Sequence, residues 1–418
     1  MASETTDAMT GDEVADRELD ALRTSIAADL PDYLDDLARL VNIDCGSYTP
    51  EGVNEVGRWT ARFLAGLGAD IEIRPDPAGR FGDTVVATFH GKADGPRALL
   101  IGHLDTVFDP GTAAERPFRI DDGIARGPGV TDMKSGLLAG LYALKSITAE
   151  LGGLPYERLT FIANPDEEVG SPTSRPHIVA AAADVDACLV LECARANGDI
   201  VSSRKGIVEA RLTVHGRAAH AGVEPEKGRN AILEAARVVR GLHALNGRWP
   251  EVTVNVGTIA GGTRPNVVAE RCELEVDARS TTADGLSEVE AAIREVAAAT
   301  EVPDTTIDVD VRMSWRPMEK LERSGRLVEH ALALAERLGF ELHDTATGGA
   351  SDANTTSGMG VPTLDGLGPI GGGDHSPAEY VEIESIVPRT TLVAGLLLAI
   401  ARDPEVLSWR ADDPRFAG

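Results

Sequence analysis

The residues best suited to chemistry are histidines and carboxylates that follow short apolar runs. The run Ala98–Ile101 predicts a buried strand, and His103 and Asp105 come directly after it. Side chains two positions apart on a strand point to the same face, so both can emerge together at the strand's carboxyl end. A neutral imidazole suits a metal ion, and a nearby carboxylate can fix its tautomer. The pattern predicts a metal site at this strand end.

Other segments bring further ligands to comparable positions. Asp132 lies in a Gly-rich loop before a helix predicted over residues 137–147, where it could instead cap that helix. Glu192 follows a strand predicted over residues 187–191 at once. His375 lies in a second Gly-rich loop. We therefore expect all three near the same edge of a sheet.

Two adjacent glutamates, Glu167 and Glu168, follow a strand predicted over residues 158–163. Neighbouring side chains at a strand end cannot both face the same way. One can therefore bind a metal while the other faces the open site as a base. The alternative interpretation is an acidic surface loop on an acidic protein.

Together, these residues comprise two histidines and several carboxylates without thiolates, the ligand set of a hydrolytic zinc or cobalt pair. A shared aspartate can bridge two ions, and water between them becomes hydroxide near neutral pH. A spare carboxylate can take the water's proton and pass it to a leaving amine. The constellation predicts metal-assisted hydrolysis by His103, Asp105, Asp132, Glu167, Glu168, Glu192 and His375.

The composition argues against several kinds of partner and location for this protein. A net charge of -27 argues against nucleic acid and anionic membranes as partners. No apolar run approaches the roughly 18 residues of a membrane span. The first 18 residues are polar and acidic, unlike a secretory signal, so we expect a cytoplasmic protein. The four cysteines have no C-x-x-C spacing and are expected to be reduced core residues.

The length of 418 residues predicts two domains. Residues 1–18 are expected to be disordered, and an amphipathic helix follows to residue 41, broken near Pro31. A β-α-β-β-α-β pattern over residues 206–314 matches the ferredoxin-like unit. The fold class expected is α/β, with a catalytic domain in two parts (19–205 and 315–418) and this α+β domain inserted between them.

The motifs resemble those of the dinuclear zinc metallopeptidases that include aminoacylase, acetylornithine deacetylase, succinyl-diaminopimelate desuccinylase and bacterial glutamate carboxypeptidase. The resemblance covers about residues 30–400 and is closest to the glutamate carboxypeptidase branch. It implies a mixed-sheet zinc-peptidase catalytic domain whose inserted domain serves as a lid and in dimerisation. The matching runs are 102–107, 127–134, 166–171, 220–222 and the stretch around His375, with 117–119 and 378–381 resembling that branch.

The resemblance implies two Zn²⁺ ions per subunit, with Co²⁺ or Mn²⁺ as alternatives. Asp132 would bridge both ions. His103 and Glu192 would complete one site, and Glu168 and His375 the other. Cys193 follows Glu192 where relatives often have proline, so this ligand departs most from the pattern.

The resemblance also assigns roles outside the ligand set. Glu167 would be the general base and acid, and Asp105 would orient His103. His220 would reach a neighbouring active site across a homodimer and stabilise the oxyanion. Asn266 and Arg279 would hold the substrate's carboxylate, a task for which a guanidinium is well suited.

The predicted function is zinc-dependent cleavage of an amide bond next to a free carboxylate by a metal-bridging hydroxide. The expected enzyme is a carboxypeptidase or amidase that releases a C-terminal Glu-like amino acid from a small peptide or N-acyl amino acid. The alternatives are an N-acyl amino acid deacylase or a dipeptidase, and more remotely a non-catalytic metal- or ligand-binding dimer. A serine hydrolase is excluded because the chain has no G-x-S-x-G elbow.

Overall fold

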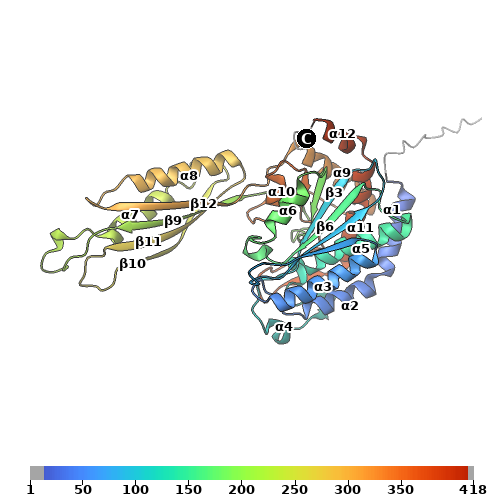
Figure 1. Cartoon of the computed structure of the whole chain (residues 1–418), viewed down its shortest axis with the longest axis horizontal. Helices are drawn as coiled ribbons and strands as arrows, with labels where there is room; N and C mark the ends of the chain where they lie inside the picture. The colour runs from blue at the N-terminus through green and yellow to red at the C-terminus, as the bar shows by residue number, and fades with distance from the viewer. Residues whose placement is uncertain (1–13, 413–418) are drawn as a thin grey trace, which may run out of the picture. The chain divides into compact units, whose positions relative to one another are not determined.

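The computed structural model describes residues 14–412, which form two compact units (Figure 1). Of the described residues, unit 1 comprises 14–202, 320–345 and 351–412, and unit 2 comprises 203–319 and 346–350. The short segment 346–350 joins unit 2 because it is bonded to it. Lys205 N donates to the Thr347 carbonyl at 3.1 Å, and Arg204 Nη1 to the Gly349 carbonyl at 3.1 Å. Unit 2 is thus slightly larger than the inserted domain expected at 206–314.

The expectation of disorder up to residue 18 is wrong for its last residues, whereas residues 1–13 lie outside the described chain. A helix begins at Asp16, and its first turn is fixed by Glu18. That carboxylate accepts a bond from Ala15 N at 3.0 Å and two from the guanidinium of Arg402 at 2.7 and 2.9 Å. A capping contact and a partly buried ion pair thus order this segment.

The main sheet of unit 1 has six strands in the order β1-β2-β6-β3-β7-β14. The β1-β2 and β2-β6 pairs are antiparallel, and the other three are parallel, so the sheet is mixed as expected. Its central strands are buried and almost wholly apolar, as strands covered on both faces must be. The strands are β1 (Asp70–Arg74), β2 (Thr84–His90), β3 (Arg97–His103), β6 (Arg158–Asn164), β7 (Ala187–Val190) and β14 (Thr363–Leu364).

A second, smaller sheet in unit 1 has the order β15-β16-β5-β4. The antiparallel β15-β16 pair encloses residues 373–379, and the antiparallel β16-β5 pair sets that loop beside the one that follows β5. This sheet therefore brings together two Gly-rich loops that are about 240 residues apart in sequence. Its strands are β4 (Arg119–Asp121), β5 (Ile124–Arg126), β15 (Gly371–Gly372) and β16 (Tyr380–Glu382). Two further strands, β8 (Ile200–Arg204) and β13 (Asp344–Thr347), pair with each other.

Helices cover the main sheet. The amphipathic segment from residue 16 to 41 is two helices that part at Asp29, just before the expected break. Helix α11 packs against α5, α9 and α1, and α5 in turn contacts β3 (Figure 1). The helices are α1 (Asp16–Ala28), α2 (Leu30–Val41), α3 (Pro50–Gly66), α4 (Thr112–Glu115), α5 (Ser135–Leu151), α6 (Arg175–Ala182), α9 (Glu322–Leu338), α10 (Asp352–Ser357), α11 (Ile383–Arg402) and α12 (Pro404–Asp412).

The expectation that no apolar segment is long enough to span a membrane is wrong for helix α11. By length and composition it is such a candidate, the one found among residues 14–412. Its most apolar stretch is 78% buried inside unit 1. The helix is apolar because it lies in the core, against helices on several sides.

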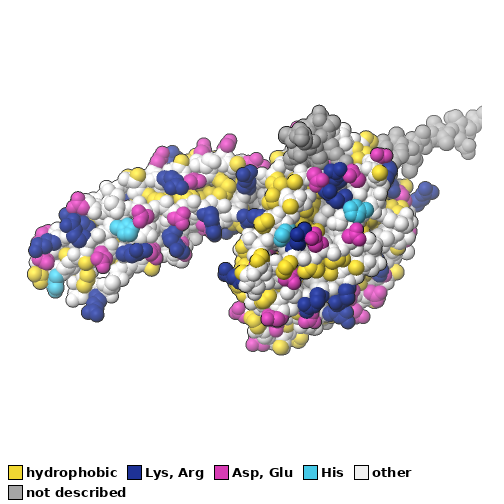
Figure 2. Space-filling view, viewed as in Figure 1, with side chains coloured by type: hydrophobic (Ala, Val, Ile, Leu, Met, Phe, Trp, Pro, Cys, Tyr) yellow, Lys and Arg dark blue, Asp and Glu magenta, His cyan; other side chains and the backbone are white. Residues whose placement is uncertain are grey.

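Unit 2 is the ferredoxin-like domain predicted from the strand and helix pattern. Its antiparallel sheet has the order β10-β11-β9-β12, and α7 and α8 pack on one face over a core of Val, Leu and Ile side chains. On the face drawn in Figure 2, acidic and basic side chains alternate across this unit. Its elements are β9 (Gly206–His215), α7 (Ala231–His243), β10 (Thr253–Gly261), β11 (Arg271–Ser280), α8 (Ala283–Ala298) and β12 (Thr306–Trp315).

The backbone of Leu191, which directly follows β7, packs closely against Gly136. A Cβ atom added at Gly136 would lie 1.8 Å from the backbone oxygen of Leu191, the residue before Glu192. We expect Gly136→Ala to lower the free energy of unfolding by about 1–3 kcal/mol, as overpacking does in cores. Urea unfolding measures this. Gly66→Ala is the matched control, since no atom lies within 4 Å of its Cβ position; equal stability of the two variants would contradict the prediction.

Candidate active site

Three adjacent strand ends gather the predicted residues on one edge of the main sheet. Strand β3 ends at His103 and pairs in parallel with β6 and β7, so the carboxyl ends of all three lie at the same edge. Glu167 and Glu168 lie in a short turn three residues beyond β6, and Glu192 lies two residues beyond β7. Residues almost 90 positions apart in the chain thereby become neighbours.

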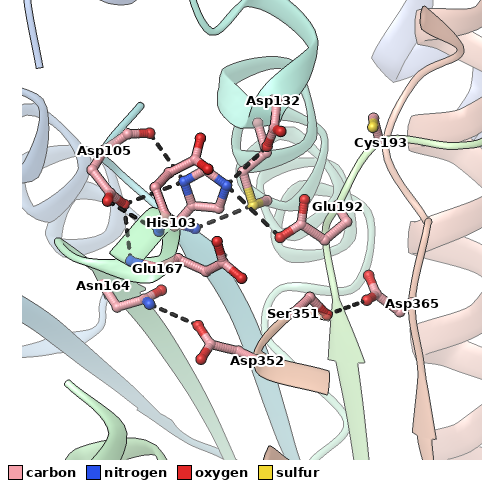
Figure 3. Close-up of polar contacts among 12 residues, drawn as sticks. His103, Asp105, Asp132, Asn164, Glu167, Glu192, Cys193, Ser351, Asp352 and Asp365 are labelled. Carbon is pink, nitrogen blue, oxygen red and sulfur yellow. Dashed lines mark hydrogen bonds and ion pairs between the residues drawn. The ribbon is translucent and has the colours of Figure 1, made fainter. Parts of the chain in front are cut away.

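Asp132 lies between the two histidines. Its Oδ1 is 3.0 Å from His103 Nε2, and its Oδ2 is 3.1 Å from His375 Nε2. Glu168 Oε2 is 3.2 Å from His375 Nε2, and Glu192 Oε1 is 3.7 Å from His103 Nε2. One carboxylate therefore faces two imidazoles, each with a second carboxylate beside it. Figure 3 shows the part of this arrangement around His103, with Asp132 and Glu192.

The distances between these side chains and their burial fit a metal centre, independently of the sequence motifs. His103, Asp132 and Glu168 offer ligand atoms within 4.8 Å of one another, and so do His103, Glu167 and Glu192. Within the described residues, Glu168 Oε1 is buried and has no hydrogen-bond partner. A buried carboxylate oxygen without a partner is costly unless a cation or proton satisfies it. Oxygen and imidazole ligands in this number suit Zn²⁺ or a similar divalent ion.

The electrostatics of the cluster reflect burial and mutual hydrogen bonding. Burial opposes the charge of Asp132, but bonds with His103 and His375 outweigh it and lower the pKa of that carboxyl. Hydrogen bonds with Asp132 and Glu168 raise the pKa of His375 to about 10. For Glu167, burial and then the nearby charge of Glu192 raise the pKa well above the ordinary value. A raised pKa suits a group that must both accept and return a proton near neutral pH.

Asp105 joins the ends of β3 and β6. Its carboxylate accepts bonds from Ser47 Oγ at 2.7 Å, from Glu167 N at 3.2 Å and from Glu168 N at 3.3 Å. Towards His103 its backbone oxygen is nearest, at 3.0 Å from Nδ1, while its Oδ1 is 3.4 Å from the same atom. Besides its predicted contact with His103, this residue therefore fixes the turn that carries both glutamates.

A buried polar cluster borders Glu167 on the side away from Asp105. Asp352, the first residue of α10, accepts bonds at 2.7 Å from Asn164 Nδ2 and from Ser171 Oγ. Burial raises the pKa of Asp352 to about 6 despite these bonds. Figure 3 shows the Glu167 carboxylate directed towards Glu192 and this cluster.

The loop that carries His375 is held to the loop of Asp132 by Glu379. The Glu379 carboxylate is buried and accepts bonds from the backbone N–H groups of Gly129 at 2.8 Å, Thr131 at 2.9 Å and Asp132 at 3.1 Å. His375 itself has a φ of +59°, a left-handed conformation that is costly for a residue with a side chain. Such strain at a candidate ligand suggests that the loop is shaped for its function.

Three predicted substrate residues lie in unit 2. His220 is exposed, and its Nδ1 accepts a bond from Gly222 N at 3.2 Å. The backbone of Asn266 accepts a bond from Ala221 N at 3.0 Å, so Asn266 and His220 are neighbours. Arg279 is farther along the chain: it contacts both carboxylate oxygens of Asp277, at 2.8 and 3.1 Å, and the Gly348 carbonyl at 2.8 Å.

Comparison with known proteins assigns this arrangement to a family. The model of the peptidase family M20/M25/M40 matches residues 99–399, most of the chain. The chain belongs to this family. Its members are metal-dependent hydrolases, so this chain has the machinery of an M20-family peptidase or amidase.

Several relatives of the M20 family are similar over nearly their whole length. The chain is 30% identical to carboxypeptidase G2 of Pseudomonas sp. (strain RS-16), covering 93% of this chain and 94% of that one. It is 29% identical to succinyl-diaminopimelate desuccinylase of Dechloromonas aromatica (strain RCB), over 85% and 95% of the two chains. The structure of aminopeptidase PepT from Bacillus cereus has the same fold, with a TM-score of 0.76 and 24% identity over 89% and 99%.

No sequence motif identifies the residues that hold the candidate metal ligands in place. Glu379 was part of a motif that resembles one branch of the family, yet nothing in the motif indicates which groups its carboxylate binds. Ser47 and Asn164 carried no signal at all. Their partners are 58 and 188 residues away, so their roles become visible only in the folded chain.

We expect Glu379→Gln to weaken metal binding roughly 10- to 100-fold, as the loss of residues that support metal ligands does. The amide that replaces one carboxylate oxygen would point its N–H₂ at backbone donors and release the Asp132 loop. Chelator competition measures the affinity. Glu384→Gln, at an exposed position in the first turn of α11, is the control. Unchanged affinity in both variants would contradict a positioning role for Glu379.

Proposed function

We propose that this M20-family chain is a dinuclear zinc hydrolase that cleaves an amide bond next to a free carboxylate. One observation carries the proposal: the Asp132 carboxylate faces His103 with one oxygen and His375 with the other. A bridging carboxylate between two imidazoles is the arrangement that a pair of ions needs. In this proposal His103 and Glu192 complete one metal site, and Glu168 and His375 the other.

When bound, two ions would polarise the substrate carbonyl and lower the pKa of a water molecule towards neutrality. Glu167 would take the proton from that water and return it to the leaving nitrogen. Burial and the charge of Glu192 favour the protonated form of Glu167, which helps the second transfer. Asp105 would keep Glu167 and Glu168 facing their separate tasks by holding their backbone N–H groups.

The substrate we propose has a free carboxylate and a Glu-like leaving amino acid. Support comes from carboxypeptidase G2 among the relatives and from the motifs around residues 117–119 and 378–381. We propose that Arg279 and Asn266 bind the carboxylate, since a guanidinium fork matches it in shape and charge. Contact with Asp277 fixes the plane of the Arg279 guanidinium.

We also propose that the chain is a homodimer that associates through unit 2. Strand β10 lies at an edge of the sheet, which leaves one side available for pairing. Four large apolar side chains of this unit are exposed by 42–73%: Val223, Ile232, Leu233 and Ile259. Exposed apolar side chains beside the free side of an edge strand are typical of an interface.

A mixing experiment tests whether His220 acts in the partner's active site. Glu167→Ala and His220→Ala should each be nearly inactive alone. After random exchange of subunits, half of the dimers combine one intact Glu167 with one intact His220, which restores roughly a quarter of wild-type activity. No recovery, together with sedimentation of the wild type as a monomer, would overturn the dimer and the role of His220.

Metal content and substrate range test the main proposal together. Protein purified without chelator should contain about two Zn²⁺ per chain. It should hydrolyse members of a panel of peptides and N-acyl amino acids that have free carboxylates, fastest with C-terminal Glu. Faster release from N-acetylated or dipeptide substrates would favour the deacylase or dipeptidase alternative. A metal-free protein, or one without hydrolysis after loading with Zn²⁺, would overturn the proposal.

A cytoplasmic location stays a prediction. The four cysteines are buried and unpaired, which is consistent with a reducing compartment.

A further inference from the structure

A small cavity in unit 1 opens beside Glu168 and has no role in the chemistry described above. Its volume is about 220 Å³, smaller than the roughly 300–1,000 Å³ of pockets that hold a whole drug-sized ligand. Among its lining residues, three apolar side chains are exposed to solvent: Tyr48 by 60%, Val107 by 41% and Val169 by 36%. The lining residues are Gly46, Ser47, Tyr48, Thr49, Thr106, Val107, Phe108, Asp109, Pro110, Glu168 and Val169.

The position of the general base indicates which part of the substrate this cavity would receive. Glu167 must reach the leaving nitrogen, so the leaving amino acid lies on the side of Glu167. That carboxylate is directed towards Glu192 and Asp352 (Figure 3). The cavity is lined by Glu168 instead, and not by these three residues. The acyl half of the substrate, on the other side of the scissile bond, is therefore the half that points towards the cavity.

The charged residues around the cavity indicate which kind of acyl group it can hold. The ionisable carboxylates lining the cavity belong to Asp109 and Glu168, and none of the described lining residues is basic. Arg80 contacts the ring of Tyr48, with its guanidinium carbon 5.1 Å from the ring centroid, but it is not a lining residue. A succinyl carboxylate would have no basic lining residue to pair with and would lie near the carboxylate of Asp109, which is unfavourable; the charge of Glu168 is offset by the metal ions in the proposed function. An uncharged apolar or aromatic group would meet Tyr48, Val107 and Val169.

We infer that this cavity is the acyl-side subsite and that it selects an uncharged apolar or aromatic acyl group over an anionic one. The inference rests on the proposed amide hydrolysis at the Asp132 cluster. Tyr48 is the residue we expect to determine specificity, because its ring is the largest exposed apolar group at the cavity. Its ring also packs against Phe81, with centroids 5.5 Å apart, which holds it in position.

The test compares N-benzoyl, N-acetyl and N-succinyl derivatives of one amino acid, the one that the enzyme releases fastest. We expect the wild type to prefer benzoyl over acetyl by roughly tenfold in kcat/KM, and over succinyl by more. Tyr48→Ala should lower kcat/KM for the benzoyl substrate roughly tenfold and for the acetyl substrate less than twofold. Tyr48→Phe should keep the preference, and Tyr48→Arg should raise the ratio of succinyl to benzoyl hydrolysis.

The outcomes separate this inference from the function on which it rests. Ile73→Ala and Ile73→Arg are matched controls, because Ile73 is an exposed apolar residue of β1 outside the cavity. Metal content and thermal unfolding verify that each variant is folded. If the wild type and all Tyr48 variants hydrolyse the three substrates in the same ratios, the subsite is wrong while the hydrolase remains. If the Zn²⁺-loaded wild type hydrolyses none of them, the subsite and the proposed hydrolase function are both wrong.

Discussion

Glu167→Gln is expected to lower kcat by roughly 10²–10⁴-fold, the usual contribution of a general acid and base. The amide has nearly the shape of the carboxylate but can neither accept the proton from water nor return it to the leaving nitrogen. The variant should still contain about two metal ions per chain, because the proposed ligands are unchanged. Steady-state kinetics and elemental analysis of the same preparation measure both quantities.

The neighbouring glutamate is the sharpest control for this prediction. Glu168→Gln should lose metal as well as activity, because Glu168 contacts His375 and carries a buried oxygen that has no hydrogen-bond partner among residues 14–412. The geometry also groups Glu167 with His103 and Glu192 as possible metal ligands. If Glu167→Gln loses metal while Glu168→Gln retains it, the two roles are reversed.

Asp132→Asn should have the second large effect, on metal binding itself. The substitution removes the negative charge that the two imidazole-centred sites share and puts an N–H₂ group towards one histidine. We expect metal content to fall below one ion per chain and kcat/KM to drop by on the order of 10³-fold or more. Chelator competition and kinetics with added Zn²⁺ measure these changes.

A surface aspartate provides the matched comparison. Asp121 is exposed and pairs with Arg119 in the small sheet, so Asp121→Asn should leave metal content and kinetics unchanged. An Asp132→Asn protein that retains two ions and wild-type kinetics would show that Asp132 is not a bridging ligand.

The sequence predicts which candidate residues lie close together where strand geometry alone brings them there, whereas their roles stay predictions. The apolar runs before His103, Glu167 and Glu192 indicate parallel strands, and such strands end at one edge of a sheet. The pattern of unit 2 also predicts its fold, because hydrophobic alternation and helix periodicity agree over its whole length.

The supporting contacts could not be predicted, because they depend on pairings between distant segments. Glu379 meets the Asp132 loop only because β16 pairs with β5, and these strands have three residues each. Strands this short leave almost no periodic signal in a sequence. The apolar appearance of α11 likewise follows from helices that pack on it, which the local sequence does not indicate.

The turn of residues 167–169 has a consequence for how enzymes of this kind can diverge. Its backbone N–H groups at Glu167 and Glu168 are both held by Asp105, so each side chain's direction depends on its place in the turn. Inserting or deleting one residue there would exchange the directions of the two carboxylates and abolish both tasks together. Evolution and protein engineering can therefore alter this turn by substitution but not by length. Tyr48 precedes α3 and is not part of this turn, so its side chain can be substituted, and the proposed acyl selectivity changed, without altering the length of the turn.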